Sequence, residues 1–398
     1  MDDSIYPASR FNHCFAADDY DRINLKYFSK LRDNNQMSAD PSGWLNTVPE
    51  VTKIMTVNAE DIVPYYSDYH LQLKKCKSKI LELLSQWDNL YYDYDEITLC
   101  HSVTVGFVIV LTSLLKLGIR NIFFESPAYF STINQAKYLG FNTILMPTYY
   151  DSNFQFNISA DLIRKNSPCA IIVTQPRTSL GYNQDNNNIQ YIGSCLSKKD
   201  YLIIDEASEQ IFPSVLNLIN NHNCKNIIKL RSFIKGMGLN GIRLSFIAHS
   251  KELRLDFQNH MEIFQGAIDY NSLKFIYELS ANIENYKTLL GIANQQVVNL
   301  RENVEKTLLG SKVEASKLVN GYMGSLFVPL NSNSIPFLRN RELLLKYCFE
   351  RKMPIITGAT MRFARDSEKE FIKINYFKSH NEIMQGIKIL LGFFNRVQ

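Results

Sequence analysis

Residues 227–249 read IIKLRSFIKGMGLNGIRLSFIAH, two short apolar runs joined by a loop with too much glycine for the interior of a helix. Lys235 lies in the middle of this loop, three residues after Ser232 and eight residues before Arg243. The glycines around Lys235 let the backbone adopt positive φ or approach a bulky group closely. The loop is therefore a candidate functional site, although an isolated Lys-Gly pair is more often an exposed lysine in a turn.

The residue types in this loop indicate a cofactor. A lysine amine beside a serine hydroxyl and an arginine guanidinium suits a cofactor that forms an imine and carries a phosphate, such as pyridoxal 5'-phosphate (PLP). The spacing resembles the Ser-x-x-Lys-x-x-Gly-Leu-x-Gly-x-Arg signature of the class I/II aminotransferase-like family, the fold-type I PLP-dependent enzymes. The resemblance implies that Lys235 forms an internal aldimine with PLP and that Ser232 and Arg243 bind the cofactor.

Length and composition are those of a soluble protein. The 398 residues exceed what one hydrophobic core usually holds, so we expect two domains. The net charge of +4, without a basic run, does not indicate nucleic acid as a partner. The N-terminus lacks the apolar region of a secretory signal, and the longest apolar segment, residues 103–117, is too short to span a membrane.

Cysteine and histidine usage agrees with this class. The seven cysteines are dispersed and form no Cys-x-x-Cys pair, which predicts reduced thiols in a cytoplasmic protein. The seven histidines do not cluster at the spacing of metal ligands, so we expect no metal site.

Apolar runs of strand length recur along the chain, and amphipathic segments of helical length fill most of the gaps. The predicted strands are residues 97–101, 121–124, 143–146, 170–174, 201–205, 227–230 and 244–248, and the helices between them include residues 103–117, 131–139 and 188–197. This alternation predicts an α/β fold with a doubly wound, mostly parallel, seven-stranded sheet. The loop of Lys235 leaves little room for a crossover helix, so the last strand should run antiparallel.

We expect three parts along the chain. Residues 1–60 form an N-terminal arm that packs on the small domain or on a dimer partner, residues 61–271 the large PLP-binding domain, and residues 272–398 a smaller α+β domain. The last part should contain one or two helices over residues 272–309 with a break near Gly291, strands at 325–328, 354–356 and 371–376, and a closing helix at 381–394.

Asp205 is the second candidate catalytic residue. It follows four apolar strand residues, where a carboxylate costs free energy unless it has a partner. It could cap the next helix or pair with the protonated pyridine nitrogen of PLP, which makes the ring an electron sink. The thirty residues between Asp205 and Lys235, and the likeness of Asp205-Glu206-Ala207-Ser208 to the family's Asp-x-Ala-Tyr motif, favour the second role.

Two other strand ends resemble cofactor contacts of the family. The turn at residues 175–181 is similar to the Asn-Pro-x-Asn-Pro-Thr-Gly motif, and Thr178 stands where the family has the asparagine that binds the PLP 3'-oxygen. Tyr129, two residues after Pro127, matches the aromatic residue that stacks on the pyridine, although such an aromatic is more often simple packing.

The phosphate of the cofactor has further candidate ligands. Ser102, Val103 and Thr104 begin the helix predicted at residue 103, where free amides and hydroxyls form a cradle for an anion. Helix capping alone would need only Ser102. The resemblance also implies that Tyr65 or, in our choice, Tyr66 reaches the phosphate of a neighbouring subunit in a homodimer.

Four residues depart from the family pattern. Ser208 and Thr178 replace the tyrosine and the asparagine at the 3'-oxygen, and this loss of donors should raise the proton affinity of the aldimine. Ile234 replaces a serine that many relatives carry. Lys373 stands at the position of the arginine that binds the substrate α-carboxylate, where a lysine keeps the charge but loses the bidentate fork. The competing interpretation is that Lys373 is a solvated strand residue.

The resemblance implies a cytoplasmic, homodimeric PLP-dependent aminotransferase that acts on an amino acid or an amine. Lys235 would move the Cα proton of the substrate, provided that its pKa is depressed. A PLP-dependent lyase, decarboxylase or cyclase of the same fold remains the alternative. The retained Lys235 and the absence of a DNA-binding segment count against a non-enzymatic ligand-sensing domain.

Overall fold

The computed structural model describes most of the chain from residue 65 onward and a few residues before it. The described residues are 28, 31, 36–42, 65–88, 91–150, 154, 156–181, 183–208, 226–232, 235–239, 242–281, 283–317, 321–329, 337–358 and 369–397.

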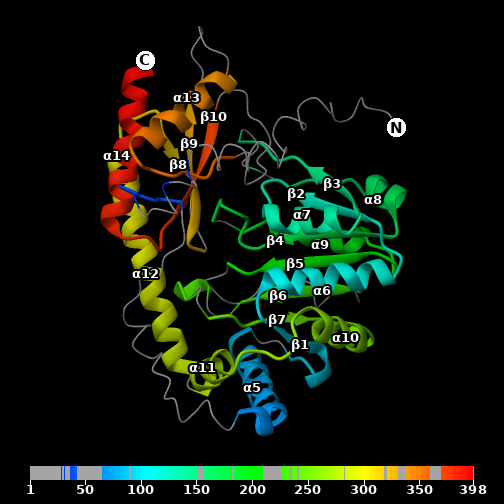
Figure 1. Cartoon of the computed structure of the whole chain (residues 1–398). Coiled ribbons are helices and arrows are strands. Elements are labelled where there is room, and N and C mark those ends of the chain that lie inside the picture. The colour runs from blue at the N-terminus through cyan, green and yellow to red at the C-terminus, as the bar shows by residue number, and fades with distance from the viewer. Residues whose placement is uncertain are drawn as a thin grey trace.

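The larger sheet has seven strands in the order β1-β7-β6-β5-β4-β2-β3 (Figure 1). The strands are β1 Ile97–Cys100, β2 Asn121–Glu125, β3 Asn142–Met146, β4 Cys169–Thr174, β5 Tyr201–Glu206, β6 Ile227–Arg231 and β7 Ser245–Ala248. All pairs from β3 through β2, β4 and β5 to β6 are parallel, whereas β7 is antiparallel to both β6 and β1. The predicted fold, including the antiparallel last strand, is confirmed.

Alternate residues of the central strands enter two different cores, because successive side chains of a strand point to opposite faces. Phe124 and Ile172 pack on one face with residues of α6 (Val103–Lys116), α7 (Phe130–Tyr138) and α10 (Arg254–Phe264). Phe123 and Ile171 pack on the other face with residues of α8 (Ala160–Asn166) and α9 (Asn186–Cys195). The sheet is therefore covered on both faces, and its carboxyl edge stays available for a site.

A second, three-stranded sheet has the order β10-β9-β8 and is antiparallel throughout. Its strands are β8 Glu314–Ala315, β9 Met323–Pro329 and β10 Lys369–Asn375, and its helices are α13 Phe337–Glu350 and α14 His380–Val397. A third core joins this sheet to β1, β7, α5 (Tyr65–Asp88), α11 (Tyr270–Ala281) and α12 (Ile283–Leu308). Figure 1 shows α12 running from α11, beside the large sheet, to the small one.

Some details of the second half differ from the prediction. Gly291 lies inside α12, so the helix has no break at this residue; residue 282, between α11 and α12, lies outside the described residues. Residues 354–356 form no strand, and the bridge beside them joins Thr357 to Ile372. The helices α8, α10 and α13 were not predicted. The boundaries of the three parts stay predictions, although Asn375 donates a backbone hydrogen bond to Pro41, which ties the N-terminal residues to the small sheet.

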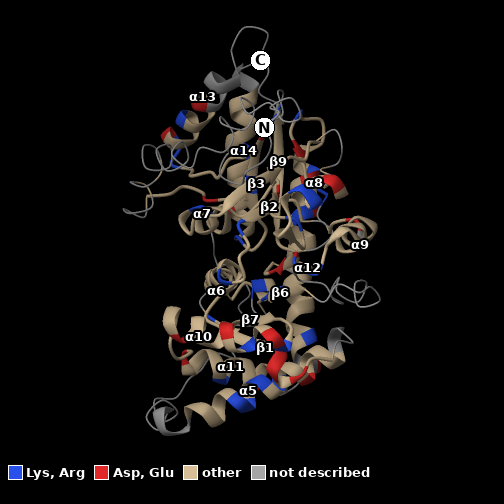
Figure 2. Cartoon of the chain, turned by 90° about the vertical axis from the view of Figure 1, so that its right-hand side faces the viewer, with Lys and Arg blue, Asp and Glu red and all other residues tan. Residues whose placement is uncertain are grey.

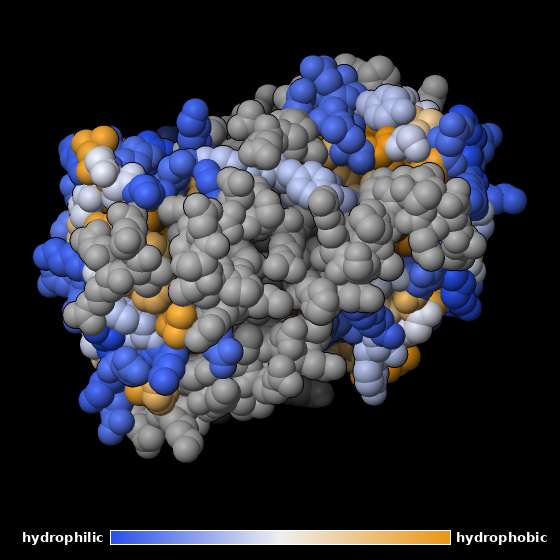
Figure 3. All heavy atoms as spheres, turned by 90° about the horizontal axis from the view of Figure 1, so that it is seen from above, coloured by the Kyte–Doolittle hydropathy of each residue, from blue (hydrophilic) through white to orange (hydrophobic). Residues whose placement is uncertain are grey.

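The described surface mixes charges and apolar groups. The helices α5 and α8 both carry basic and acidic residues (Figure 2). Seen from above, hydrophilic residues predominate among the described ones, with small hydrophobic groups between them (Figure 3). Within the described residues, no helix is long and apolar enough to cross a membrane.

We predict that Gly106→Val destabilises the protein, because α6 lies very close to the sheet. A Cβ at Gly106 would lie 2.9 Å from Cδ2 of Leu230 and 3.2 Å from Sγ of Cys100, both of them buried. Overpacking of this kind costs about 1–3 kcal/mol. Gly291→Ala is the control, since nothing lies within 4 Å of its Cβ position, and should gain about 0.5–1 kcal/mol of helix propensity. Urea unfolding measures both, and an unchanged midpoint for Gly106→Val would contradict the packing.

Candidate active site

The strand register brings most of the predicted site residues to one edge of the large sheet. Cys100 of β1 lies opposite Ser245 of β7, so Ser102 and Arg243, each two residues beyond, emerge at the same edge. Ser232 follows the end of β6, which pairs in parallel with the end of β5. Because the carboxyl ends of parallel strands meet at one edge, Asp205 belongs to the same group.

Asp205 and Lys235 form the electrostatic centre of this edge. Burial raises the pKa of Asp205, and the charge of Lys235 acts against this shift. Burial lowers the pKa of Lys235, Asp205 opposes the change, and Arg243 adds to it. Ala207 donates a backbone hydrogen bond to Asp205 Oδ1 at 2.9 Å, which fixes the carboxylate. A lysine with a lowered pKa more readily provides the neutral amine that a nucleophile or base requires.

The backbone turn that contains Lys235 is supported by a helix. Lys235 begins a 3₁₀ turn, Lys235–Met237, which packs against α12. Met237 is fully buried in the core that includes α12. The long helix that joins the two sheets therefore also supports the loop of Lys235.

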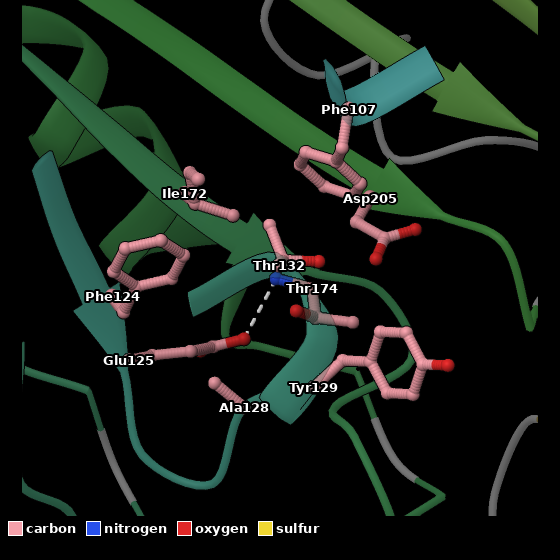
Figure 4. A pocket seen from close by; sticks show the side chains of 9 residues that line it. All are labelled: Phe107, Phe124, Glu125, Ala128, Tyr129, Thr132, Ile172, Thr174 and Asp205. Atoms are coloured by element: carbon pink, nitrogen blue, oxygen red, sulfur yellow. Dashed lines mark hydrogen bonds between the residues drawn. The ribbon is translucent and has the colours of Figure 1, made fainter. Parts of the chain in front are cut away.

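Tyr129 and Asp205 lie beside each other at a small hollow (Figure 4). The hollow is lined by residues of the strands β2, β4 and β5 and of α6 and α7 or the turn before α7: Phe107, Phe124, Glu125, Ala128, Tyr129, Thr132, Ile172, Thr174 and Asp205. Figure 4 shows the carboxylate of Asp205 pointing toward the ring of Tyr129. Burial raises the pKa of Tyr129, Asp205 raises it further, and Arg243 opposes the shift. The exposed Arg243 is thus close enough to influence both Tyr129 and Lys235.

The first turn of α6 can bind an anion through its backbone amides, while the Ser102 side chain caps the helix. The Ser102 hydroxyl accepts a hydrogen bond from the backbone N–H of Val105 at 3.2 Å, so it caps the helix. Val103 is buried and Thr104 half-buried in the first turn, where backbone N–H groups have no partner within the helix. Capping by Ser102 is compatible with an anion bound by these amides.

Two predicted residues are less directly connected with the hollow. Thr178 is buried in the turn after β4, whereas the threonine that lines the hollow is Thr174, at the end of the strand itself. The turn packs on the small sheet through a hydrogen bond from Ser325 Oγ to the carbonyl of Ser179, 2.7 Å long. Tyr66 lies in the first turn of α5, and its side chain is outside the described residues.

Lys373 is placed next to the centre by the small sheet. Its side chain is only 4% exposed, so the interpretation as a solvated strand residue is wrong. Burial lowers its pKa to about 8; Asp40 opposes this, and Lys235 and Lys378 contribute to it. Ser42 Oγ donates to the Lys373 carbonyl at 2.6 Å, which connects β10 to the N-terminal residues. The buried amine of Lys373 is thus near Lys235, as its predicted role requires.

A family model named aminotransferase class I and II matches residues 35–268, which is more than half of the 398 residues. The chain belongs to the class I and II aminotransferase family. The predicted family is therefore confirmed, and PLP is the cofactor that characterises this family.

Curated relatives of this aminotransferase-family chain include two proteins named histidinol-phosphate aminotransferase. The protein of Buchnera aphidicola subsp. Cinara cedri is 25% identical over 213 residues, 53% of this chain and 55% of the relative. That of Deinococcus radiodurans is 22% identical over 156 residues, 39% of this chain and 43% of the relative. The chain thus spans about half the length of the curated relatives it matches.

Solved structures of aminotransferases share the fold over nearly the whole chain. A mutant of Thermus thermophilus aspartate aminotransferase has a TM-score of 0.73 at 14% identity, covering 95% of this chain and 96% of its own. N-succinyldiaminopimelate aminotransferase of Mycobacterium tuberculosis has a TM-score of 0.74 at 13% identity, covering 93% and 99%. At such identities the likeness shows the fold alone.

The site of this family member also contains a buried ion pair that sequence reasoning missed. Glu125 and Arg177 are both almost completely buried, with 3.6 Å between Arg177 Nε and Glu125 Oε2. Glu125 also accepts from the backbone N–H of Thr174 at 2.7 Å and from the side chain of Gln184. The signal in the sequence was a carboxylate directly after the apolar strand residues 121–124, the same pattern as at Asp205.

Tyr322 is the second residue that the sequence did not indicate. It precedes β9, is fully buried, and lies within hydrogen-bonding reach of Ser208 and close to Tyr129 and Asp205. More than one hundred residues separate it from Ser208, and no motif connects the two positions.

We predict that Arg177→Met is strongly destabilising, because it removes the cation beside a buried carboxylate. Breaking a buried pair in this way costs about 3–5 kcal/mol. Burial already raises the pKa of Glu125 despite Arg177, so the variant should raise it further. The deficit should shrink as the pH falls from the raised pKa of folded Glu125 toward about 4.3, the pKa of a carboxyl in an unfolded chain, because protonated Glu125 needs no cation beside it.

The matched control is Arg164→Met, which breaks an exposed pair with Asp161 and should cost no more than about 0.5 kcal/mol. Urea unfolding at neutral and acidic pH compares the two variants. Equal costs for both would contradict the structural role of the Glu125–Arg177 pair.

Proposed function

We propose that this chain is a PLP-dependent aminotransferase that acts on an amino acid. The observation that carries the proposal is that a buried carboxylate and an aromatic ring line one hollow, and that an amine with a lowered pKa lies close to the carboxylate. Asp205, Lys235 and Tyr129 come from different segments, and each influences another's charge. The buried carboxylate of Asp205 points into the hollow and fits a cationic ring nitrogen better than water. The residues present thus fit PLP.

When bound, PLP supplies a carbonyl that bonds to amines and a ring that accepts electrons from the substrate Cα. Lys235 would hold the cofactor covalently and, once released, would carry the Cα proton. Asp205 would keep a proton on the pyridine nitrogen, and Tyr129 would lie against the ring. Ser232, Arg243 and the amides at Val103 and Thr104 would hold the phosphate.

Lys373 would bind the α-carboxylate of the substrate. Its buried amine lies near Lys235, where the reacting carbon must be, and Lys378 adds a second buried cation nearby. Asp40 pairs with Lys378 at 3.5 Å and Glu382 pairs with it at 3.7 Å, so the positive charge offered to a substrate would come from Lys373 while it is protonated. Such a group suits a carboxylate more than an amine substrate.

The alternative is a lyase, decarboxylase or cyclase of the same fold. Replacement of the expected arginine by Lys373 favours it, because a lysine holds a carboxylate with less directional control than an arginine fork.

The proposal includes a cytoplasmic homodimer. α10 exposes Leu255 and Ile263, which are 70% and 72% exposed, and Phe264 follows them. Such side chains on one helix are what an interface between two copies would cover. The cysteines in the described part of the chain are free thiols, in keeping with a reducing compartment.

A panel of amino acids, each with and without a keto acid, tests the reaction. Transfer of the amino group should need the keto acid, whereas a lyase or decarboxylase would form product without it. Lys235→Ala should lower turnover by at least the about 10²–10⁴-fold that general acid–base catalysis contributes. Borohydride reduction followed by peptide mass spectrometry should place the cofactor on Lys235. A label on another lysine, or no bound PLP, would refute the proposal.

Lys373 should make substrate binding depend on pH. Its amine is charged below about pH 8 and neutral above, so KM for a carboxylate substrate should rise as the pH passes through about 8. Lys373→Arg keeps its charge in this range and should remove that rise. Lys373→Ala should weaken binding below pH 8 by roughly ten- to hundredfold, the effect of one charged hydrogen bond. Coincident KM profiles of the wild type and Lys373→Arg would exclude Lys373 from the carboxylate site.

A further inference from the structure

Tyr322 brings a phenol from the small sheet to the loop that follows Asp205. The side chain is completely buried, and the side chain of Ser208 is close enough to act on the pKa of its hydroxyl. Ser208 stands three residues after Asp205, at the position where the family pattern has a tyrosine. The structure therefore places a tyrosine hydroxyl from elsewhere in the chain beside the position that lacks one.

The backbone beside Tyr322 lies very close to two loops that follow strands of the large sheet, those of Pro176 and Ser208. Gly321 has φ of +79°, and a Cβ on it would lie 2.7 Å from Cγ of Pro176 and 3.0 Å from the carbonyl oxygen of Ser208. No side chain fits there without displacing one of the two loops. The approach of Tyr322 to Ser208 is consequently a close backbone contact and not the chance reach of a long side chain.

Two contacts with residues 376 and 377 fix Tyr322, one through its ring and one through its backbone. Phe377 stacks on it with 4.6 Å between ring centroids and 24° between the planes. The backbone N–H of Tyr376 donates to the Tyr322 carbonyl at 2.9 Å. The phenol is thus fixed between the small sheet and the Ser208 loop.

The charges near Tyr322 keep it a hydrogen-bond donor. Burial raises the pKa of the phenol, Ser208 acts against this, and Tyr129 and Asp205 raise the pKa further. The hydroxyl is therefore protonated at neutral pH. Tyr322 is close enough to Tyr129 and Asp205, two residues that line the hollow, for both to act on its pKa.

We propose that Tyr322 is the residue that donates a hydrogen bond to the 3'-oxygen of PLP, and that Ser208 positions its hydroxyl. This inference rests on the proposed PLP function. It reverses one expectation from the sequence, namely that the replacement of the tyrosine at position 208 leaves the 3'-oxygen without a phenolic donor. The donor is retained but comes from a different sheet.

The proton affinity of the imine between PLP and Lys235 reports on this bond without any substrate. A donor at the 3'-oxygen stabilises negative charge there, which favours the unprotonated imine. Its loss should favour the protonated imine, whose absorbance lies at longer wavelength. The experiment is a pH titration of the visible absorbance of the holoenzyme for the wild type, Tyr322→Phe and Ser208→Ala.

Tyr322→Phe should move the midpoint upward by about one to two pH units, the equivalent of one hydrogen bond to a charged group. Ser208→Ala should move it in the same direction by less, because the phenol remains. The double variant Tyr322→Phe, Ser208→Tyr should return the midpoint toward the wild type, since it places a phenol at the position usual in the family.

The control is Tyr376→Phe, which removes another fully buried hydroxyl that lies near Arg301 and Glu305 of α12. Its midpoint should equal that of the wild type, and thermal unfolding of each variant identifies any that fails to fold. If Tyr322→Phe is yellow, folded and titrates like the wild type, or shifts no more than Tyr376→Phe, the inference is wrong. If the wild type binds no PLP, the proposed function itself fails, which is a distinct result.

Discussion

Asp205 is a carboxylate that the fold removes almost entirely from water, and its neighbours are arranged around that cost. A buried charge is tolerated only when paired or hydrogen-bonded. Here the backbone N–H of Ala207 and the nearby amine of Lys235 offset part of the penalty. The offset requires β5 and β6 to end at one edge and the following loop to turn back at once. Because β7 is antiparallel to β6, the loop that carries Lys235 starts and ends at the same edge of the sheet, close to Asp205.

Further charged groups continue outward from Asp205, each acting on the next. Lys378 pairs with Asp40, Asp40 influences Lys373, Lys373 lies near Lys235, and Lys235 faces Asp205. Each of these groups has at least one neighbour of opposite charge. Lys235 and Lys373 also have a cationic neighbour that lowers the pKa. The small sheet and the N-terminal residues are therefore part of the electrostatics of the site and not only of its shape.

The large sheet could be predicted because its strands, buried on both faces, are continuous apolar runs that end in polar residues. The elements of the smaller α+β part were harder to predict from the sequence. Gly291 suggested a break, but a glycine costs only about 1 kcal/mol in a helix, and the packing of α12 outweighs this. Glu125–Arg177 and Ser208–Tyr322 were missed because their members are far apart in sequence and match no motif. Local patterns indicate strand ends, whereas such pairs depend on how two turns come to face each other.

Residues 38–42 contact the small sheet through several hydrogen bonds and one ion pair. Their hydrogen bonds to Lys352, Ile356, Lys373 and Asn375, together with the Asp40–Lys378 pair, make them an added edge of the small sheet. The Asp40 carboxylate is the negative charge beside Lys378 and acts on the pKa of Lys373. The N-terminal residues therefore set the charge at this end of the small sheet as well as extending its edge.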